Sequence, residues 1–193
     1  MKLKLLFLFY SVLILINNIN VFCYAQTYKK NDNIINIIRK NYAKINSQIK
    51  NYSKKKILLY DEATEGSELT AYYDDKELKK IMKWSYGETE KEFTEYYYAD
   101  NKFFFVYSKR YIYELKQDEN NIYPDREKIA TIEENRWYFS NQKLIRWICG
   151  KTFMKKTSND FIKYDWYFSK IFYRYIDIFV NGNIEKNGAV LRR

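Results

Sequence analysis

Histidine is absent from this 193-residue chain, and cysteine, proline and glycine are scarce, with two, one and five residues. Without histidine the chain has no Ser/His or Cys/His catalysis, no imidazole metal ligand and no side chain that normally titrates near neutrality. The glycines are isolated from one another, which excludes a glycine-rich phosphate-binding loop. We therefore expect no metal site and no cofactor, and an enzyme is disfavoured.

Residues 1–25 have the features of a secretory signal peptide. Two lysines, Lys2 and Lys4, precede an apolar run of about a dozen residues, which is too short to span a bilayer. The triplet 23–25, Cys-Tyr-Ala, then places small residues at the −3 and −1 positions of a cleavage site. We expect cleavage after Ala25 and a periplasmic or secreted protein of residues 26–193. The alternative is a lipoprotein acylated at Cys23, which Phe22 disfavours because that position requires a small residue.

Cleavage would leave Cys149 as the only cysteine, so no intramolecular disulfide is expected. Cys149 ends an apolar run and is read as a buried thiol rather than a nucleophile. The net charge of +10 is dispersed, and the densest basic run is only Lys54 to Lys56. Nucleic-acid binding is therefore unlikely.

Residues 26–55 contain a predicted amphipathic helix. Isoleucines and tyrosines recur at spacings of three and four residues from Ile34 to Tyr52, after the capping cluster Asn31 to Asn33. The opposite face is basic, with Arg39, Lys40, Lys44 and Lys50. This helix either packs on the protein's own sheet or lies on an anionic membrane surface.

Residues 56–150 read as short strands joined by tight turns, because aromatic and β-branched runs alternate with Asp, Asn, Gly and Lys. The predicted strands are 57–60, 68–73, 78–86, 92–98, 102–115, 135–139 and 143–148. Residues 120–125 form a turn-like connection, and 126–134 fit either a short helix or a strand.

Residues 151–193 are predicted to form a helix and a basic tail. The stretch 161–180 follows the capping cluster 158–160 and lacks Gly, Pro and Asn, which favours a helix, although its aromatic and isoleucine content also suits strands. Residues 183–193 are expected to fray. The fold is thus α+β: an antiparallel meander of about six or seven strands, with both helices on the same face, and residues 26–193 as a single domain.

A weak repeat marks three hairpin turns. Residues 72–78, 97–103 and 138–144 align without gaps as an aromatic pair, a small or acidic residue, Asp or Asn, a polar residue, Lys or Glu, and an apolar residue. In this pattern Asp or Asn tolerates positive φ in the turn, and the aromatic residues pair across the strands.

These three hairpins resemble the repeated unit of the bacterial YwqK antitoxin family and of MORN-like sheet repeats. The stretch from Glu65 through Tyr86 to Ile148 is also similar to small exported proteins of Bacteroidetes that have no assigned activity. Either resemblance implies an open antiparallel sheet that binds something, without catalytic residues.

Aromatic residues are the main excess, with 21 Tyr, 13 Phe and 4 Trp. Alternate residues of a strand face opposite sides, so we expect some rings on an open sheet face. The candidate binding residues are Tyr73, Tyr97, Tyr107, Tyr111, Tyr113 and Tyr138. One interpretation is that tyrosine fills strand positions for structural reasons alone. The functional interpretation is a non-enzymatic exported module that binds a protein or an envelope polymer.

Two other classes of function remain open. A histidine-free hydrolase could act on glycans through two carboxylates from the clusters Glu88 to Glu95 or Asp61 to Glu65. A peripheral membrane protein could use the basic face of the N-terminal helix. A cleft with two facing carboxylates would favour the hydrolase, and an uncovered apolar helix stripe would favour the membrane protein.

Overall fold

The structure, a computed structural model, describes residues 32–118 and 121–191. The predicted signal peptide and its cleavage site lie outside the described residues. The chain divides into two compact units between Arg39 and Lys40, so the N-terminal helix, residues 32–48, belongs partly to each unit. The unit that begins at Lys40 contains the sheet and the C-terminal helix.

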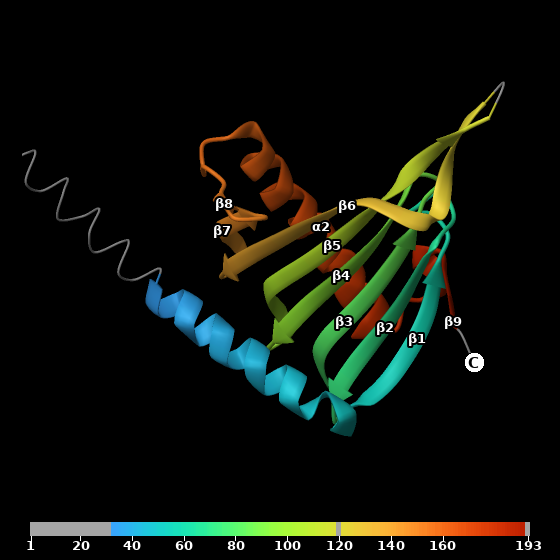
Figure 1. Cartoon of the computed structure of the whole chain (residues 1–193). Coiled ribbons are helices and arrows are strands. Elements are labelled where there is room, and N and C mark those ends of the chain that lie inside the picture. Colours follow the sequence, from blue (N-terminus) through green and yellow to red (C-terminus); the bar gives the residue numbers. More distant parts are fainter. Residues whose placement is uncertain (1–31, 119–120, 192–193) are drawn as a thin grey trace, which may run out of the picture. The chain divides into compact units, whose positions relative to one another are not determined.

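Within the described residues, nine strands form one antiparallel sheet in the order β8-β7-β6-β5-β4-β3-β2-β1-β9 (Figure 1). A short 3-10 helix, η1 (Ile49–Asn51), leads into the sheet. The strands are β1 (Ser53–Leu59), β2 (Ser67–Asp74), β3 (Glu77–Tyr86), β4 (Glu90–Ala99), β5 (Lys102–Gln117), β6 (Ile122–Ser140), β7 (Lys143–Cys149), β8 (Thr152–Phe153) and β9 (Ala189–Leu191). The predicted α+β class and antiparallel meander are confirmed.

The three repeated hairpins share one turn geometry. Asp75, Asp100 and Asn141 occupy the same repeat position, and each has a positive φ near 50°. Aspartate and asparagine adopt this left-handed conformation more readily than most residues, which is the role expected for them. Each hairpin also carries a β-bulge at its aromatic pair, between residues 72/73, 97/98 and 138/139.

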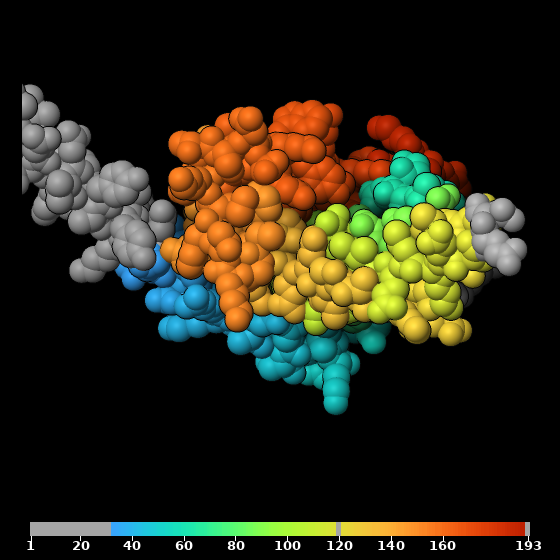
Figure 2. Space-filling view, turned by 45° about the horizontal axis from the view of Figure 1, so that its top comes forward, coloured from blue at the N-terminus to red at the C-terminus, as the bar shows by residue number. Residues whose placement is uncertain are grey.

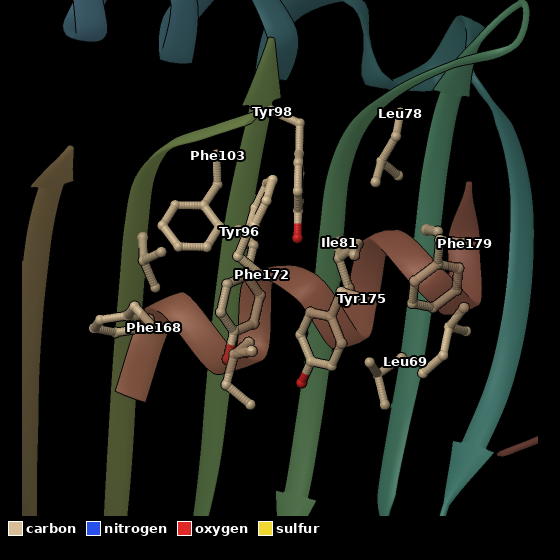
Figure 3. Packing of buried hydrophobic residues seen from close by; sticks show 14 of the residues in the cluster. Leu69, Leu78, Ile81, Tyr96, Tyr98, Phe103, Phe168, Phe172, Tyr175 and Phe179 are labelled. Carbon is tan, nitrogen blue, oxygen red and sulfur yellow. The ribbon is translucent and has the colours of Figure 1, made fainter. Parts of the chain in front are cut away.

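The C-terminal helix α2 (Asn159–Phe179) covers one face of the sheet, called here the α2 face. Ser158 caps the helix, its hydroxyl accepting from the Phe161 amide at 3.2 Å. Bulky residues then recur along one side of α2 and meet sheet residues in a single core (Figure 3). Tyr175 of α2, for example, is fully buried and packs edge-to-face on Tyr96 with ring centroids 5.2 Å apart.

The two helices do not pack on the same face, which corrects the expectation from sequence. Tyr96 points toward α2, whereas its neighbour Tyr97 contacts Tyr42 of the N-terminal helix at 4.9 Å between ring centroids. Because successive residues of a strand face opposite sides, residues 40–48 lie on the other face, called here the outer face. The two predicted helices had been expected to cover a single face of the sheet, but the alternation of strand residues places apolar side chains on both faces.

Two further expectations were wrong. Residues 122–125, predicted as part of a turn-like connection, pair with 114–117 as a ribbon that extends beyond the rest of the sheet (Figure 1). Residues 126–134, for which helix and strand were both open, continue the same long strand. The C-terminal tail is ordered in part, because Gly188, with φ 67°, turns the chain and residues 189–191 pair with β1. A short 3-10 helix, η2 (Glu185–Asn187), precedes this turn.

Candidate functional site

The aromatic pairs of the repeated hairpins split between the two faces of the sheet. The second ring of each pair, at Tyr73, Tyr98 and Phe139, lies on the α2 face, and Tyr73 donates its hydroxyl hydrogen to the Phe179 carbonyl at 2.9 Å. The first ring is buried at every copy: Tyr72 is 9% exposed, Tyr97 0% and Tyr138 5%. The repeat therefore builds the two sides of the hairpins rather than a solvent-facing aromatic surface.

Tyr97 belongs to a buried polar network beneath the N-terminal helix. Its hydroxyl donates to Glu95 Oε2 at 2.8 Å and accepts from Asn46 Nδ2 at 3.0 Å. Lys80 Nζ lies 2.6 Å from Glu95 Oε1 and 2.9 Å from Asn46 Oδ1. Burial raises the pKa of Tyr97 well above its usual value and lowers that of Lys80. This network attaches residues 40–48 to the sheet.

Tyr113 and Tyr138 are also removed from solvent. Tyr138 packs on Phe105 with ring centroids 5.0 Å apart, and Phe105 in turn contacts Tyr42. Tyr113 is 8% exposed and sits where the β5–β6 pairing is irregular. The expectation that Tyr97, Tyr113 and Tyr138 lie exposed is thus contradicted, because Tyr42 and Asn46 contact the outer face at the hairpin end and Tyr113 is buried as well.

Tyr107 and Tyr111 are the two predicted residues on the part of the outer face that reaches solvent. Both are half-buried. Arg136 lies over the Tyr107 ring at 5.7 Å, and Lys91 lies over the Tyr111 ring at 5.8 Å. Burial, together with the neighbouring carboxylate of Glu134, raises the pKa of Tyr107 to about 12. The Tyr107 hydroxyl is therefore neutral at physiological pH.

Tyr111 belongs to a larger group of rings around Trp84. We call this group the aromatic patch and define it as Trp84, Tyr86, Phe93 and Tyr111. The Trp84 indole is nearly parallel to Tyr86 and Tyr111, with interplanar angles of 15° and 25° and centroids 6.4 and 6.2 Å away. Phe93 leans on the same indole at 4.9 Å. Strands β3, β4 and β5 thus present a contiguous set of rings, of which Tyr86 is 39% exposed.

Charged side chains flank the aromatic patch. Lys109 pairs with Glu134 at 3.3 Å, and Glu134 also accepts from Arg136 at 2.8 Å. These cations hold the pKa of Glu134 below its usual value, with Lys109 contributing most. All three are about one-third exposed, so the patch has a polar, partly basic border.

Trp84, Tyr86 and Phe93 were not among the predicted binding residues, which were tyrosines of the hairpins and of the strand 102–115. The available signal was period-two alternation: Met82, Trp84 and Tyr86 are alternate residues of one predicted strand and must share a face. Their register with Phe93 and Tyr111 follows from the pairing of β3, β4 and β5.

Both carboxylate clusters considered for hydrolysis contain carboxylates that are ion-paired with cationic side chains. Arg174 lies 2.8 Å from Asp61 and 3.1 Å from Glu62. Arg110 lies 2.6 Å from Glu133 and 3.6 Å from Glu90. In the apolar stripe of the N-terminal helix, Ile45 is only 6% exposed, whereas Tyr42 is 38% exposed.

In the part of the chain that the structure describes, no three His, Cys, Asp or Glu side chains gather as metal ligands. No helix among these residues is long and apolar enough to cross a membrane. Comparison of the chain with known protein families, with curated proteins and with solved structures finds no match.

Proposed function

We propose that this protein is an exported, non-enzymatic binding module that contacts an envelope polymer through the aromatic patch. The observation that carries the proposal is the near-parallel arrangement of Trp84 with Tyr86 and Tyr111 on the solvent side of the sheet. Rings packed in the core of this protein mostly meet edge-to-face, as Tyr96 and Tyr175 do at 89°. Stacked rings on a surface instead form one contiguous and rigid aromatic contact area.

A glycan chain fits such a surface. The face of an aromatic ring carries negative partial charge, and the C–H groups of a sugar ring are weakly positive, so the two stack favourably. The rigid strands fix the rings before binding, so little conformational entropy is lost when a ligand is bound. The bordering Lys91, Lys109 and Arg136 offer donors to hydroxyl and carboxylate oxygens. An anionic cell-wall glycan therefore matches both the rings and the charges.

Cosedimentation with purified peptidoglycan tests the proposal. Residues 26–193 should sediment with the polymer, and the variant Trp84→Ala/Tyr111→Ala should bind at least tenfold more weakly, because the stacked faces are lost. Tyr123→Ala is the matched control: Tyr123 is 44% exposed on the β5–β6 ribbon and lies outside the patch. Circular dichroism should be unchanged in both variants.

Two results would count against this proposal. The first is sedimentation of the patch variant at the level of the wild type. The second is failure of the wild type to sediment while it captures an envelope protein in a Trp84-dependent manner, which would make the patch a protein-binding surface.

A further inference from the structure

A pocket of about 460 Å³ lies on the α2 face, opposite to the aromatic patch. It is bounded by strands β3 to β7 and by the first half of α2. Figure 2 shows the orange residues of α2 above the gold and green residues of these strands. The volume falls in the range of small-molecule sites.

The floor of the pocket is formed by three cross-strand rows of different character. The first row is Ile81, Tyr96, Val106, Trp137 and Trp147; the second is Lys83, Thr94, Ser108, Asn135 and Cys149; the third is Ser85, Glu92, Arg110 and Glu133. The apolar core thus passes into a polar row and then into a charged row while α2 continues above them. This gradient gives the pocket an apolar end and a charged mouth.

Aromatic rings form rigid walls at the apolar end. Trp137 and Trp147 stack with an interplanar angle of 20° and centroids 6.1 Å apart. Tyr164 of α2 contacts both indoles, at 5.5 and 4.8 Å between centroids. Phe168 closes the group at 5.1 Å from Trp137. Such walls suit a flat ring.

Two buried polar atoms at this pocket have no hydrogen-bond partner within the described residues: Ser108 Oγ and Trp137 Nε1. Ser108 is 1% exposed and Trp137 3%. By contrast, the neighbouring Trp147 Nε1 donates to Asn135 Oδ1 at 2.9 Å. Buried polar groups are nearly always paired, and an indole N–H is only a donor. These two atoms favour a ligand that offers an acceptor at the apolar end of the pocket.

The mouth favours a positive charge. Arg110 is the one cation of the third row, and it is shared by Glu133 at 2.6 Å and Glu90 at 3.6 Å, while Glu92 is its direct partner in the strand register. Lys83 is already paired with Glu62 at 3.0 Å. Even with Lys163 of α2 at the mouth, acidic groups outnumber the free cations there. An ammonium group would be attracted to this position.

We propose that this pocket binds a small aromatic amine whose ring carries an oxygen acceptor. The ring packs against the wall formed by the indoles and Tyr164, the oxygen accepts from Trp137 Nε1 and exchanges a hydrogen bond with Ser108, and the ammonium faces the carboxylates of the mouth. This site is independent of the polymer-binding function proposed for the outer face.

Three related ligands test the proposal on residues 26–193, with affinity measured by isothermal titration calorimetry. Tyramine has the ring, the oxygen and the ammonium. Phenethylamine lacks the oxygen, and 4-hydroxyphenylacetate replaces the ammonium with a carboxylate. Tyramine should bind at least tenfold more tightly than either, because each loses one of the two polar contacts.

Three variants assign the contacts. Ser108→Ala and Trp137→Phe should each weaken tyramine binding about tenfold and leave phenethylamine binding nearly unchanged. Ser108→Ala should also keep or raise the melting temperature, because it removes a buried hydroxyl that has no partner. Trp84→Ala, on the outer face, should not affect tyramine.

Absence of tyramine binding at millimolar concentration would overturn the proposal. Equal affinity for tyramine and 4-hydroxyphenylacetate would refute the requirement for an amine. An undiminished affinity for tyramine in both Ser108→Ala and Trp137→Phe would refute the hydrogen bonds assigned to these residues. Because Trp84 is tested separately, failure here leaves the peptidoglycan result unaffected, and the reverse also holds.

Discussion

The buried carboxylate of Glu62 connects three parts of the fold and provides the sharpest test of what stabilises it. Glu62 Oε2 lies 3.0 Å from Lys83 Nζ of β3 and accepts from the Tyr175 hydroxyl of α2 at 3.0 Å. Its other oxygen makes an ion-pair contact with Arg174 at 3.1 Å, outside hydrogen-bond geometry. The side chains of Glu62 and Lys83 are only 7% and 6% exposed. The segment between β1 and β2 is thereby held against α2.

Glu62→Gln should lower the free energy of unfolding by about 3–5 kcal/mol, because it leaves the buried Lys83 ammonium without its counter-charge. Such a loss is a large share of the ~5–15 kcal/mol that stabilises a typical domain. Lys83→Met should cost less, about 1–2 kcal/mol, since Glu62 keeps Arg174 and Tyr175. The double variant should be more stable than the sum of the two losses predicts, by about 1–3 kcal/mol.

Urea denaturation followed by tryptophan fluorescence measures these differences. Glu77→Gln is the matched control: Glu77 pairs with Lys79 at 2.7 Å but is 42% exposed, so its loss should stay below about 1 kcal/mol. The carboxylate of Glu62 raises the pKa of Lys83 despite its burial. Its contribution is therefore complete below pH 10.5 and declines above it, so the effect of Glu62→Gln should be constant from pH 6 to 9. A loss below about 1 kcal/mol in Glu62→Gln would refute this reasoning.

Four further predictions follow from other parts of the chain. Burial raises the pKa of Tyr73 from 10 to about 12. The contribution of Tyr73 to the free energy of unfolding is therefore complete below pH 10 and is lost as the pH rises toward 12. Tyr73→Phe should lower the free energy of unfolding by about 1 kcal/mol at pH 7 and reduce this alkaline loss, as measured by urea titrations at several pH values. Removal of residues 189–193 should lower the melting temperature by several degrees, since it uncovers the β1 edge, whereas Val190→Thr on the exposed side should not. The melting temperature should be the same with and without reductant, because Cys149 is the only cysteine left after cleavage. A drop on reduction would reveal an intermolecular disulfide of Cys149. Mass spectrometry of the exported protein should find Gln26 as its first residue; a lipidated Cys23 or an intact Met1 would contradict the signal peptide.

Local structure could be predicted where local chemistry determines it. The turn residues Asp75, Asp100 and Asn141 were placed correctly because they are among the few that tolerate positive φ, and α2 was placed from its Ser158 cap and its uninterrupted length. The C-terminal tail was predicted wrongly because its structure depends on a distant strand and not on local chemistry. Residues 189–191 form a strand only because β1 offers an unpaired edge, and no local signal of a three-residue strand is strong.

The faces of the sheet could not be assigned from sequence. Each aromatic pair contributes one ring to each side. The extra residue opposite each pair, at Lys79, Phe104 or Ile145, shifts the alternation of the following strand by one residue, so the facing of one strand does not carry over to the next. Burial of Tyr97 depends on Lys80 and Asn46, which lie 17 and 51 residues away in the chain. Such contacts are set by the placement of the helix, which the periodicity of single strands does not specify.

The α2-face pocket is still less visible in the sequence, because it is a property of the register and not of any one strand. Thr94, Ser108 and Asn135 each look like ordinary polar residues within their own strands. Only the pairing of β4, β5 and β6 brings them into one row, next to an apolar row on one side and a charged row on the other. A polar row at an open sheet edge would be hydrated by solvent and would give no indication of a ligand. Here α2 extends Tyr164 and Phe168 over the rows, and Ser108 Oγ and Trp137 Nε1 are buried with no hydrogen-bond partner among residues 32–118 and 121–191. Since an apolar residue at position 108 would have avoided this arrangement without loss of packing, the hydroxyl points to a ligand rather than to the fold as the reason for its presence.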